Sequence, residues 1–111
     1  MSKMSRRKGH GFEREIAKML RFVFPKARRH LEYQAIEADG VDISGTSFYK
    51  FQCKRLRKYA SIKMITEINY DEFLGEVPVL VTKGDHSPIM AVLPFDELLR
   101  LIEISQRKTK L

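Results

Sequence analysis

The segment that most constrains the fold is residues 48–54, whose sequence FYKFQCK alternates between apolar and polar side chains. Aromatic residues and a period of two predict a β-strand, because successive side chains of a strand point to opposite faces of its sheet. One set of alternate side chains would enter the core: Tyr49, Phe51 and Cys53. The other set is largely polar and would share the opposite face: Phe48, Lys50, Gln52 and Lys54.

The N-terminal half of the chain predicts a helix followed by two further strands. Residues 11–24 carry apolar side chains at helical spacing, so we expect an amphipathic helix that ends near Pro25. Residues 28–34 predict a polar strand, residues 37–40 a turn, and residues 41–43 a short strand. This short strand would precede the alternating one directly.

The C-terminal half predicts a helix, a hairpin and a last helix. Residues 61–74 have a weaker helical pattern, with Ser61 as the N-cap and Gly75 as the end. We expect two strands of a hairpin and a final amphipathic helix at residues 77–82, 89–93 and 96–104. Three apolar side chains of the final helix are expected to face inward: Leu98, Leu101 and Ile102.

The resulting order of elements, αβββαββα, predicts an α/β or α+β fold with a mixed central sheet. A chain of 111 residues supports one hydrophobic core, so we expect a single domain at 11–104, between a flexible basic arm at 1–10 and a basic tail at 105–111. No apolar run predicts a signal peptide or a membrane span. A single cysteine excludes an internal disulfide and fits a reducing cytoplasm.

The charge of the chain favours a polyanionic partner. Its formal net charge is +7, and lysines and arginines that neutralise phosphates release counterions from nucleic acid. Basic residues gather in the N-terminal arm, in residues 50–63 and in the C-terminal tail. Four acidic residues follow the second basic block, which would make one face positive and another negative: Glu67, Asp71, Glu72 and Glu76. The charge excess alone is equally consistent with an ordinary solvated surface.

Asp42, Gln52 and Lys54 form the constellation most suggestive of chemistry. If the turn pairs Gly45 with Tyr49, Asp42 stands directly opposite Gln52, and Lys54 lies two residues further along the same face. Other registers would separate these side chains. The proximity of the three is therefore a hypothesis about strand pairing.

The three side chains could hydrolyse a phosphodiester, which requires a cation, an activated water and a group that positions it. Asp42 would bind Mg²⁺ through its carboxylate, Gln52 through its amide oxygen and Cys53 through its backbone carbonyl. Lys54 would hold the water or stabilise the transition state. Glu13, near the start of the first helix, could bind the metal through water or complete a second metal position.

Other residues are candidates for contacts to the DNA backbone, because a phosphate must be held beside the metal. These candidates lie in the N-terminal arm and directly after the alternating strand: Arg6, Arg7, Lys8, His10, Arg55, Arg57 and Lys58.

Each candidate for catalysis also has a purely structural interpretation. Asp42 fits a turn, Lys54 a protected sheet edge, and Glu13 the positive end of its helix. Cys53 is better explained as a buried small hydrophobe than as a nucleophile or zinc ligand. The joint spacing of Asp42, Gln52 and Lys54 is what favours the catalytic interpretation.

Four motifs of the chain resemble the PD-(D/E)xK nuclease superfamily: GFEREI at 11–16, GVDI at 40–43, FQCKR at 51–55 and VPVLVTK at 77–83. The likeness is closest to archaeal-type Holliday junction resolvases and related small phage-encoded endonucleases, and it covers residues 6–104. It implies an αβββαβ core. It also implies a homodimer that acts on DNA four-way junctions in recombination, in the cytoplasm of a prokaryotic or phage-infected cell.

The resemblance assigns roles to four residues. Glu13 looks like the glutamate of the first helix, Asp42 like the metal-binding aspartate, and Lys54 like the catalytic lysine. Gln52 stands at the second acidic position and departs from the family pattern. Loss of that charge implies weaker Mg²⁺ binding, a preference for Mn²⁺ or greater reliance on Glu13.

Two alternatives remain open at this point. The first is a related endonuclease that cuts duplex, nicked or flap DNA. The second is a non-catalytic DNA-binding module built on the nuclease fold, which the neutral side chain of Gln52 would allow.

Overall fold

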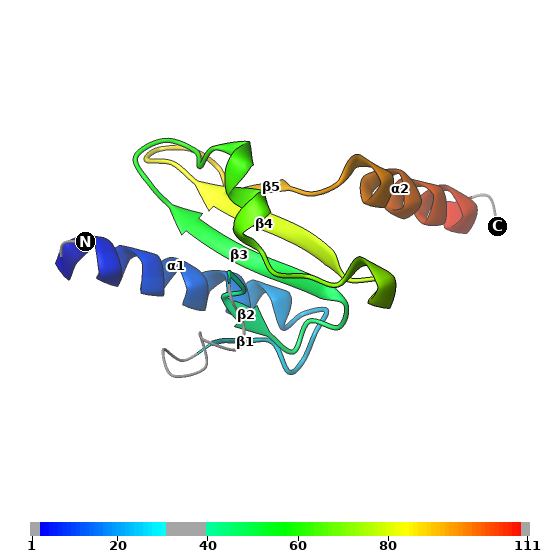
Figure 1. Cartoon of the computed structure of the whole chain (residues 1–111), viewed down its shortest axis with the longest axis horizontal. Coiled ribbons are helices and arrows are strands. Elements are labelled where there is room, and N and C mark those ends of the chain that lie inside the picture. The colour runs from blue at the N-terminus through cyan, green and yellow to red at the C-terminus, as the bar shows by residue number, and fades with distance from the viewer. Residues whose placement is uncertain (1–2, 31–39, 110–111) are drawn as a thin grey trace.

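The computed structural model describes residues 3–30 and 40–109, and within them the side chains of residues 9–30 and 40–108. Helices, strands and 3-10 segments follow one another along the chain (Figure 1). In order they are α1 (Lys3–Leu20), β1 (Arg28–Arg29), β2 (Ile43–Ser44), β3 (Tyr49–Arg55), η2 (Ile62–Glu67), η3 (Glu72–Leu74), β4 (Val77–Lys83), β5 (Met90–Val92) and α2 (Phe95–Thr109).

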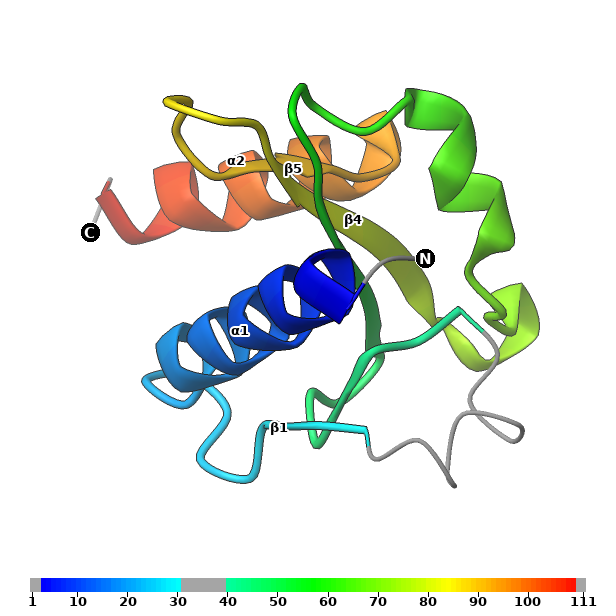
Figure 2. The ribbon, with the colours of Figure 1, turned by 90° about the vertical axis from the view of Figure 1, so that its left-hand side faces the viewer.

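The five strands form one mixed sheet in the order β1-β2-β3-β4-β5. β3 and β4 are parallel, and the other neighbouring pairs are antiparallel. The parallel pair needs a crossover, which η2 and η3 provide. Figure 2 shows α1 on one face of the sheet and the η2–η3 segment on the other. The chain is therefore an α+β domain with a mixed sheet and two main helices, in line with the predicted fold class.

The alternation predicted for β3 is confirmed. Phe51 and Cys53 are buried in the core beneath α1, where they join Phe12 and Ile16. Gln52 and Lys54 lie on the opposite face, toward η2. This single strand therefore separates an apolar layer under α1 from a polar layer under η2.

α1 begins earlier than the sequence predicts. The helix starts at Lys3, so the predicted helix boundary at residue 11 is wrong. Gly9 and Gly11 led to that boundary, but a glycine inside a helix costs only about 1 kcal/mol relative to alanine. The lysines, arginines and methionine around the two glycines are good helix formers.

Residues 61–74 form two 3-10 segments, η2 and η3, and not the predicted α-helix. The β-branched and polar residues of this stretch have low helix propensity, and Asp71 caps a separate turn by accepting from the N–H of Phe73. Two details of the prediction are confirmed. The side chain of Ser61 accepts from the N–H of Lys63, and Gly75 ends the segment in the left-handed conformation, with φ of 75°.

The predicted strands are found with changed bounds. The polar strand expected at 28–34 begins at Arg28 as β1, but residues 31–34 and part of the turn at 37–40 lie outside the described residues. The strand expected at 41–43 is β2, which begins at Ile43. The hairpin of β4 and β5 is confirmed, with Val81 opposite Ala91.

α2 differs from its prediction in length and in orientation. The helix continues to Thr109, so residues 105–109 of the expected tail are helical. The expectation that its apolar side chains face inward is wrong, since Leu98, Leu101 and Ile102 are all exposed. No helix in the described ranges is both long enough and apolar enough to span a bilayer.

Candidate active site

Asp42 is fixed in place by three hydrogen bonds at the entry to β2. Its N–H donates to the carbonyl of Phe51 (2.8 Å), and its carbonyl accepts from the N–H of His30 (2.7 Å). Its carboxylate Oδ2 accepts from the N–H of Cys53 (2.7 Å). Ile43 pairs with Phe51, which is the predicted register that sets Asp42 opposite Gln52. Backbone groups of His30, Phe51 and Cys53 therefore fix the position of Asp42.

The environment of Asp42 disfavours its charged form. Burial is the main cause that raises the pKa of this carboxyl, from 3.8 to about 6. The N–H of Cys53 lowers the pKa, the negative charge of Glu13 raises it, and the charges of Lys54 and His30 lower it. A carboxylate that is buried without full compensation is a favourable place for a cation, because the cation offsets the lost hydration.

Gln52 is one of the most buried polar residues of the sheet, with 4% of its surface exposed. Its Nε2 donates to the Glu67 carboxylate (3.2 Å). Its Oε1 is buried and has no hydrogen-bond partner among the described residues. Leaving a buried acceptor unsatisfied costs about 1–3 kcal/mol, so this oxygen is suited to a ligand from outside the described residues.

Lys54 lies beside Gln52, two residues further along β3. Its Nζ is 3.6 Å from Oε2 of Glu67, and about a third of its side chain is exposed (32%). The positive charge of Lys54 also acts on Asp42. The ammonium group is therefore near both carboxylates and still accessible from solvent.

Glu67 is a site residue that the sequence analysis did not single out. The sequence places it only in an acidic block after the basic one, whereas the structure sets its carboxylate against both Gln52 and Lys54. The signal available in the sequence was its position in the crossover that follows β3. A crossover between parallel strands packs back onto the sheet that it connects.

Gly40 holds the Asp42 segment against the end of η2. Its φ of +72° lies in the left-handed region, and a Cβ at this position would collide with the backbone carbonyl of Glu67. Only glycine permits this close approach without strain. Asp42 and Glu67 therefore belong to two segments whose backbones touch.

Glu13 is carried by α1. Its carboxylate pairs with Nε of Arg29 (3.2 Å). The negative charge of Glu13 nevertheless raises the pKa of Asp42. The structure thus places Glu13 within electrostatic reach of Asp42, with an arginine as its direct partner.

Cys53 is buried in the core, as expected for a small hydrophobe. Burial, followed by the charges of Asp42 and Glu13, raises the pKa of its thiol, which makes the thiolate unfavourable. The main contribution of Cys53 to the site is the backbone N–H that it donates to Asp42.

The candidate DNA contacts differ in their environments. Arg55 is paired with Asp85 (2.9 Å) across the end of the sheet, whereas Arg57 and Lys58 are exposed. His10 is half-buried. The side chains of Arg6, Arg7 and Lys8 lie outside the described part of the chain.

The prediction that positive and negative charges lie on separate faces is wrong for two lysines, which form ion pairs with acidic residues. Lys50 Nζ lies 3.4 Å from Glu76 Oε2, and Lys54 Nζ lies beside Glu67. The acidic block packs over the polar face of β3, because the crossover carries it back across the strand that precedes it.

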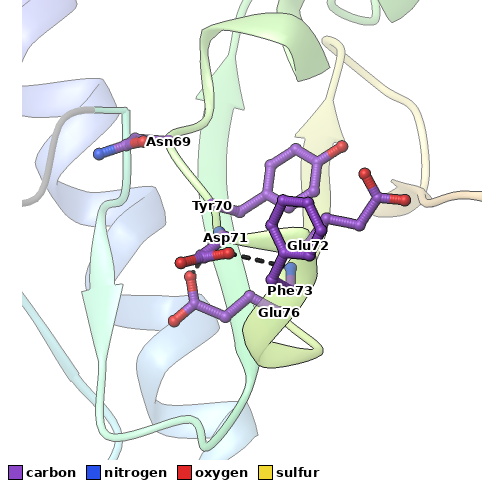
Figure 3. Close-up of a pocket in the computed structure, with 6 residues that line it drawn as sticks. All are labelled: Asn69, Tyr70, Asp71, Glu72, Phe73 and Glu76. Carbon is purple, nitrogen blue, oxygen red and sulfur yellow. Dashed lines mark hydrogen bonds between the residues drawn. The ribbon is translucent and has the colours of Figure 1, made fainter.

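A surface pocket lies at the turn between η2 and η3 (Figure 3). It is lined by Asn69, Tyr70, Asp71, Glu72, Phe73 and Glu76. Its carboxylates would repel a phosphate. Two of them already have partners, since Asp71 caps η3 and Glu76 pairs with Lys50. The acidic lining of this pocket therefore disfavours a phosphate.

The oxygen ligands around Asp42 are of the type that a hard divalent cation prefers, but they are too few to complete its coordination shell. Within residues 3–30 and 40–109, no three His, Cys, Asp or Glu side chains lie close enough together to hold a metal ion. Mg²⁺ does not need such a cage, because it usually keeps several waters and binds one or two carboxylates. The carboxylate of Asp42 and the unpartnered Oε1 of Gln52 match that requirement.

Comparisons of the chain with models of known protein families, with curated proteins and with solved structures find no match in any of the three.

Proposed function

We propose that this chain is a metal-dependent, structure-selective DNA endonuclease with a PD-(D/E)xK-type core, acting as a Holliday junction resolvase on four-way junctions. The observation that carries the proposal is the placement of Asp42. Its partly buried carboxylate, with a pKa raised to about 6, precedes Ile43, which pairs with Phe51, and it lies within reach of the charge of Lys54. A raised pKa at Asp42 and an unsatisfied buried amide oxygen at Gln52 are more readily explained by a site than by a purely structural aspartate.

Asp42 and the amide oxygen of Gln52 would hold Mg²⁺, or Mn²⁺ in its place, with the carbonyl of Cys53 as a further ligand and Glu13 acting through water. When bound, the ion supplies charge neutralisation at the phosphate and a lowered pKa for the attacking water. Lys54 orients that water or stabilises negative charge on the phosphate oxygens. Arg57 and Lys58 are exposed just beyond β3, where they can hold the flanking phosphates.

The proposed enzyme is a homodimer, and the exposed face of α2 supports this part of the proposal. Five apolar side chains of α2 expose between 38% and 67% of their surface: Phe95, Leu98, Leu99, Leu101 and Ile102. The face of α2 toward the sheet is polar instead, since Glu97 accepts from the hydroxyl of Tyr49 (2.8 Å). An apolar face of this size indicates a partner.

A second copy of the same helix is a suitable partner on charge. The first turn of α2 carries the exposed Asp96, next to Glu97, which is already paired with Tyr49 and Arg100, and the last turn carries Arg107 and Lys108. Antiparallel pairing of two copies would set the acidic end of each helix beside the basic end of the other. A parallel arrangement would place like charges together.

The test of the proposed activity is cleavage of a labelled four-way junction and a matched linear duplex in Mg²⁺, Mn²⁺ or EDTA. We expect paired, metal-dependent nicks in the junction, which Asp42→Asn and Lys54→Ala abolish. Equal cutting of the duplex would replace the resolvase assignment with a nuclease of broader specificity. Tight junction binding without cleavage in either metal would favour a non-catalytic DNA-binding module, the function that Gln52 keeps open.

A further inference from the structure

The carboxylate of Glu67 occupies a bridging position on the polar face of β3. Its Oε2 lies 3.2 Å from Nε2 of Gln52 and 3.6 Å from Nζ of Lys54. These two residues are alternate members of one strand, so a single oxygen reaches both. Glu67 thereby brings a negative charge to the position where the chain has a neutral glutamine.

The backbone of Glu67 is fixed relative to Asp42. Glu67 is the last residue of η2, and its carbonyl lies against Gly40, where a Cβ would not fit. Gly40 is two residues before Asp42. The two carboxylates therefore come from segments held in direct contact.

The amide of Gln52 gives a second, independent indication of a missing ligand. Its Nε2 is committed to Glu67, which fixes the orientation of the amide and leaves Oε1 as the free end. That oxygen is buried and has no partner among the residues described. An ion pair between Glu67 and Lys54 would explain the carboxylate alone, but it would not explain this oxygen.

We infer that Glu67 supplies the metal-binding carboxylate that Gln52 cannot, so that a divalent cation is held by Asp42 and Glu67 together with the amide oxygen of Gln52. The inference rests on the proposed function and assigns one more residue to the same site. It restores two negative charges to the site, and two carboxylates with one neutral oxygen and waters suit Mg²⁺ or Mn²⁺.

The test is Mn²⁺ binding to the full chain without DNA, measured from the electron paramagnetic resonance signal of free Mn²⁺. Glu67→Gln is expected to weaken binding by about tenfold or more, because it removes a ligand and its charge. Glu72→Gln removes the same charge from an exposed residue of the neighbouring η3 and is expected to stay within about twofold, since screening weakens distant charges. Thermal melts of both variants check that the fold is retained.

A double variant tests the exchange of roles directly. Gln52→Glu combined with Glu67→Gln moves the carboxylate from the crossover to β3, and we expect it to recover Mn²⁺ affinity to within about threefold of wild type. Unchanged Mn²⁺ affinity in Glu67→Gln overturns the inference, and if Asp42→Asn still loses the metal, the proposed function stands without it. A wild-type chain that binds no Mn²⁺ overturns both.

Discussion

The two ends of this domain bury opposite kinds of side chain. Around Asp42, polar groups are partly or fully buried, and backbone contacts fix Asp42 itself. Along α2, apolar groups are outside, and the contact with the sheet is polar, through Glu97 and Tyr49. Both arrangements are unfavourable for an isolated chain, the first because charge is buried and the second because apolar surface is exposed.

The difference indicates which kind of ligand each end requires. A partly buried carboxylate with a raised pKa is stabilised by a cation, which is small enough to enter a packed site. An exposed apolar helix face is relieved only by another large surface. We therefore propose the Asp42 end as the place for the metal and α2 as the place for the second subunit.

The largest expected effect is the loss of cleavage in Asp42→Asn. Single-turnover rates on a four-way junction should fall by at least about 100-fold, because the variant removes the charged ligand and leaves the shape of the side chain. Glu72→Gln is the matched control and should cleave at the wild-type rate. Cleavage by Asp42→Asn within a few-fold of wild type would show that the Asp42 end is not the active site.

The next effect concerns the packing that brings Asp42 and Glu67 together. Gly40→Ala should lower the free energy of unfolding by about 3 kcal/mol or more, because it adds a backbone collision to an unfavourable φ. Gly75→Ala has nearly the same φ, with no atom within 4 Å of the added Cβ, and should cost only about 1 kcal/mol. Urea denaturation measures both, and equal losses would contradict the close approach at Gly40.

Charges introduced on α2 test the other end. Leu98→Glu combined with Ile102→Glu should weaken the dimer by at least about tenfold in sedimentation equilibrium, because two carboxylates would enter the apolar face. Ile62→Glu, at another exposed apolar residue, should leave the dimer unchanged. A wild-type chain that is monomeric at tens of micromolar would refute the second-subunit assignment.

The smallest expected effect is a pH-dependent change in stability. The folded pKa of Asp42 lies above its ordinary value, so the metal-free protein loses stability as pH rises from about 4 to about 6. Asn cannot ionise, and Asp42→Asn should therefore gain about 2 kcal/mol over wild type between pH 4 and pH 8. Urea denaturation in EDTA measures this difference, which should be constant with pH if Asp42 is not buried as described.

The sequence predicts the strand pairing around Asp42 well, because this pairing depends on residues that are close together in the chain. The period of two in β3 and the tight turn before it determine both the face of Gln52 and its register against Asp42. Glu67 could not be identified in this way, since its contact with Gln52 depends on the path of the crossover. The helical prediction for residues 61–74 also failed, because propensity separates 3-10 turns from an α-helix poorly.

α2 shows what an amphipathic sequence pattern cannot predict. Its amphipathic pattern correctly predicts a helix, but the pattern states only that a face should be buried and not what covers it. The prediction placed that face against the sheet. The start of α1 was missed for a related reason, because neighbouring residues outweigh the small cost of Gly9 and Gly11.

The most direct test of the central claim is a count of the protons released when Mn²⁺ binds, by isothermal titration calorimetry in buffers of different ionisation enthalpy. A cation at Asp42 must displace the proton that the raised pKa retains. We predict release of about 0.8 proton per Mn²⁺ at pH 5.5 and almost none at pH 8, with both binding and release lost in Asp42→Asn. Binding that releases no proton at pH 5.5, or that persists in Asp42→Asn, would contradict a metal site at this carboxylate.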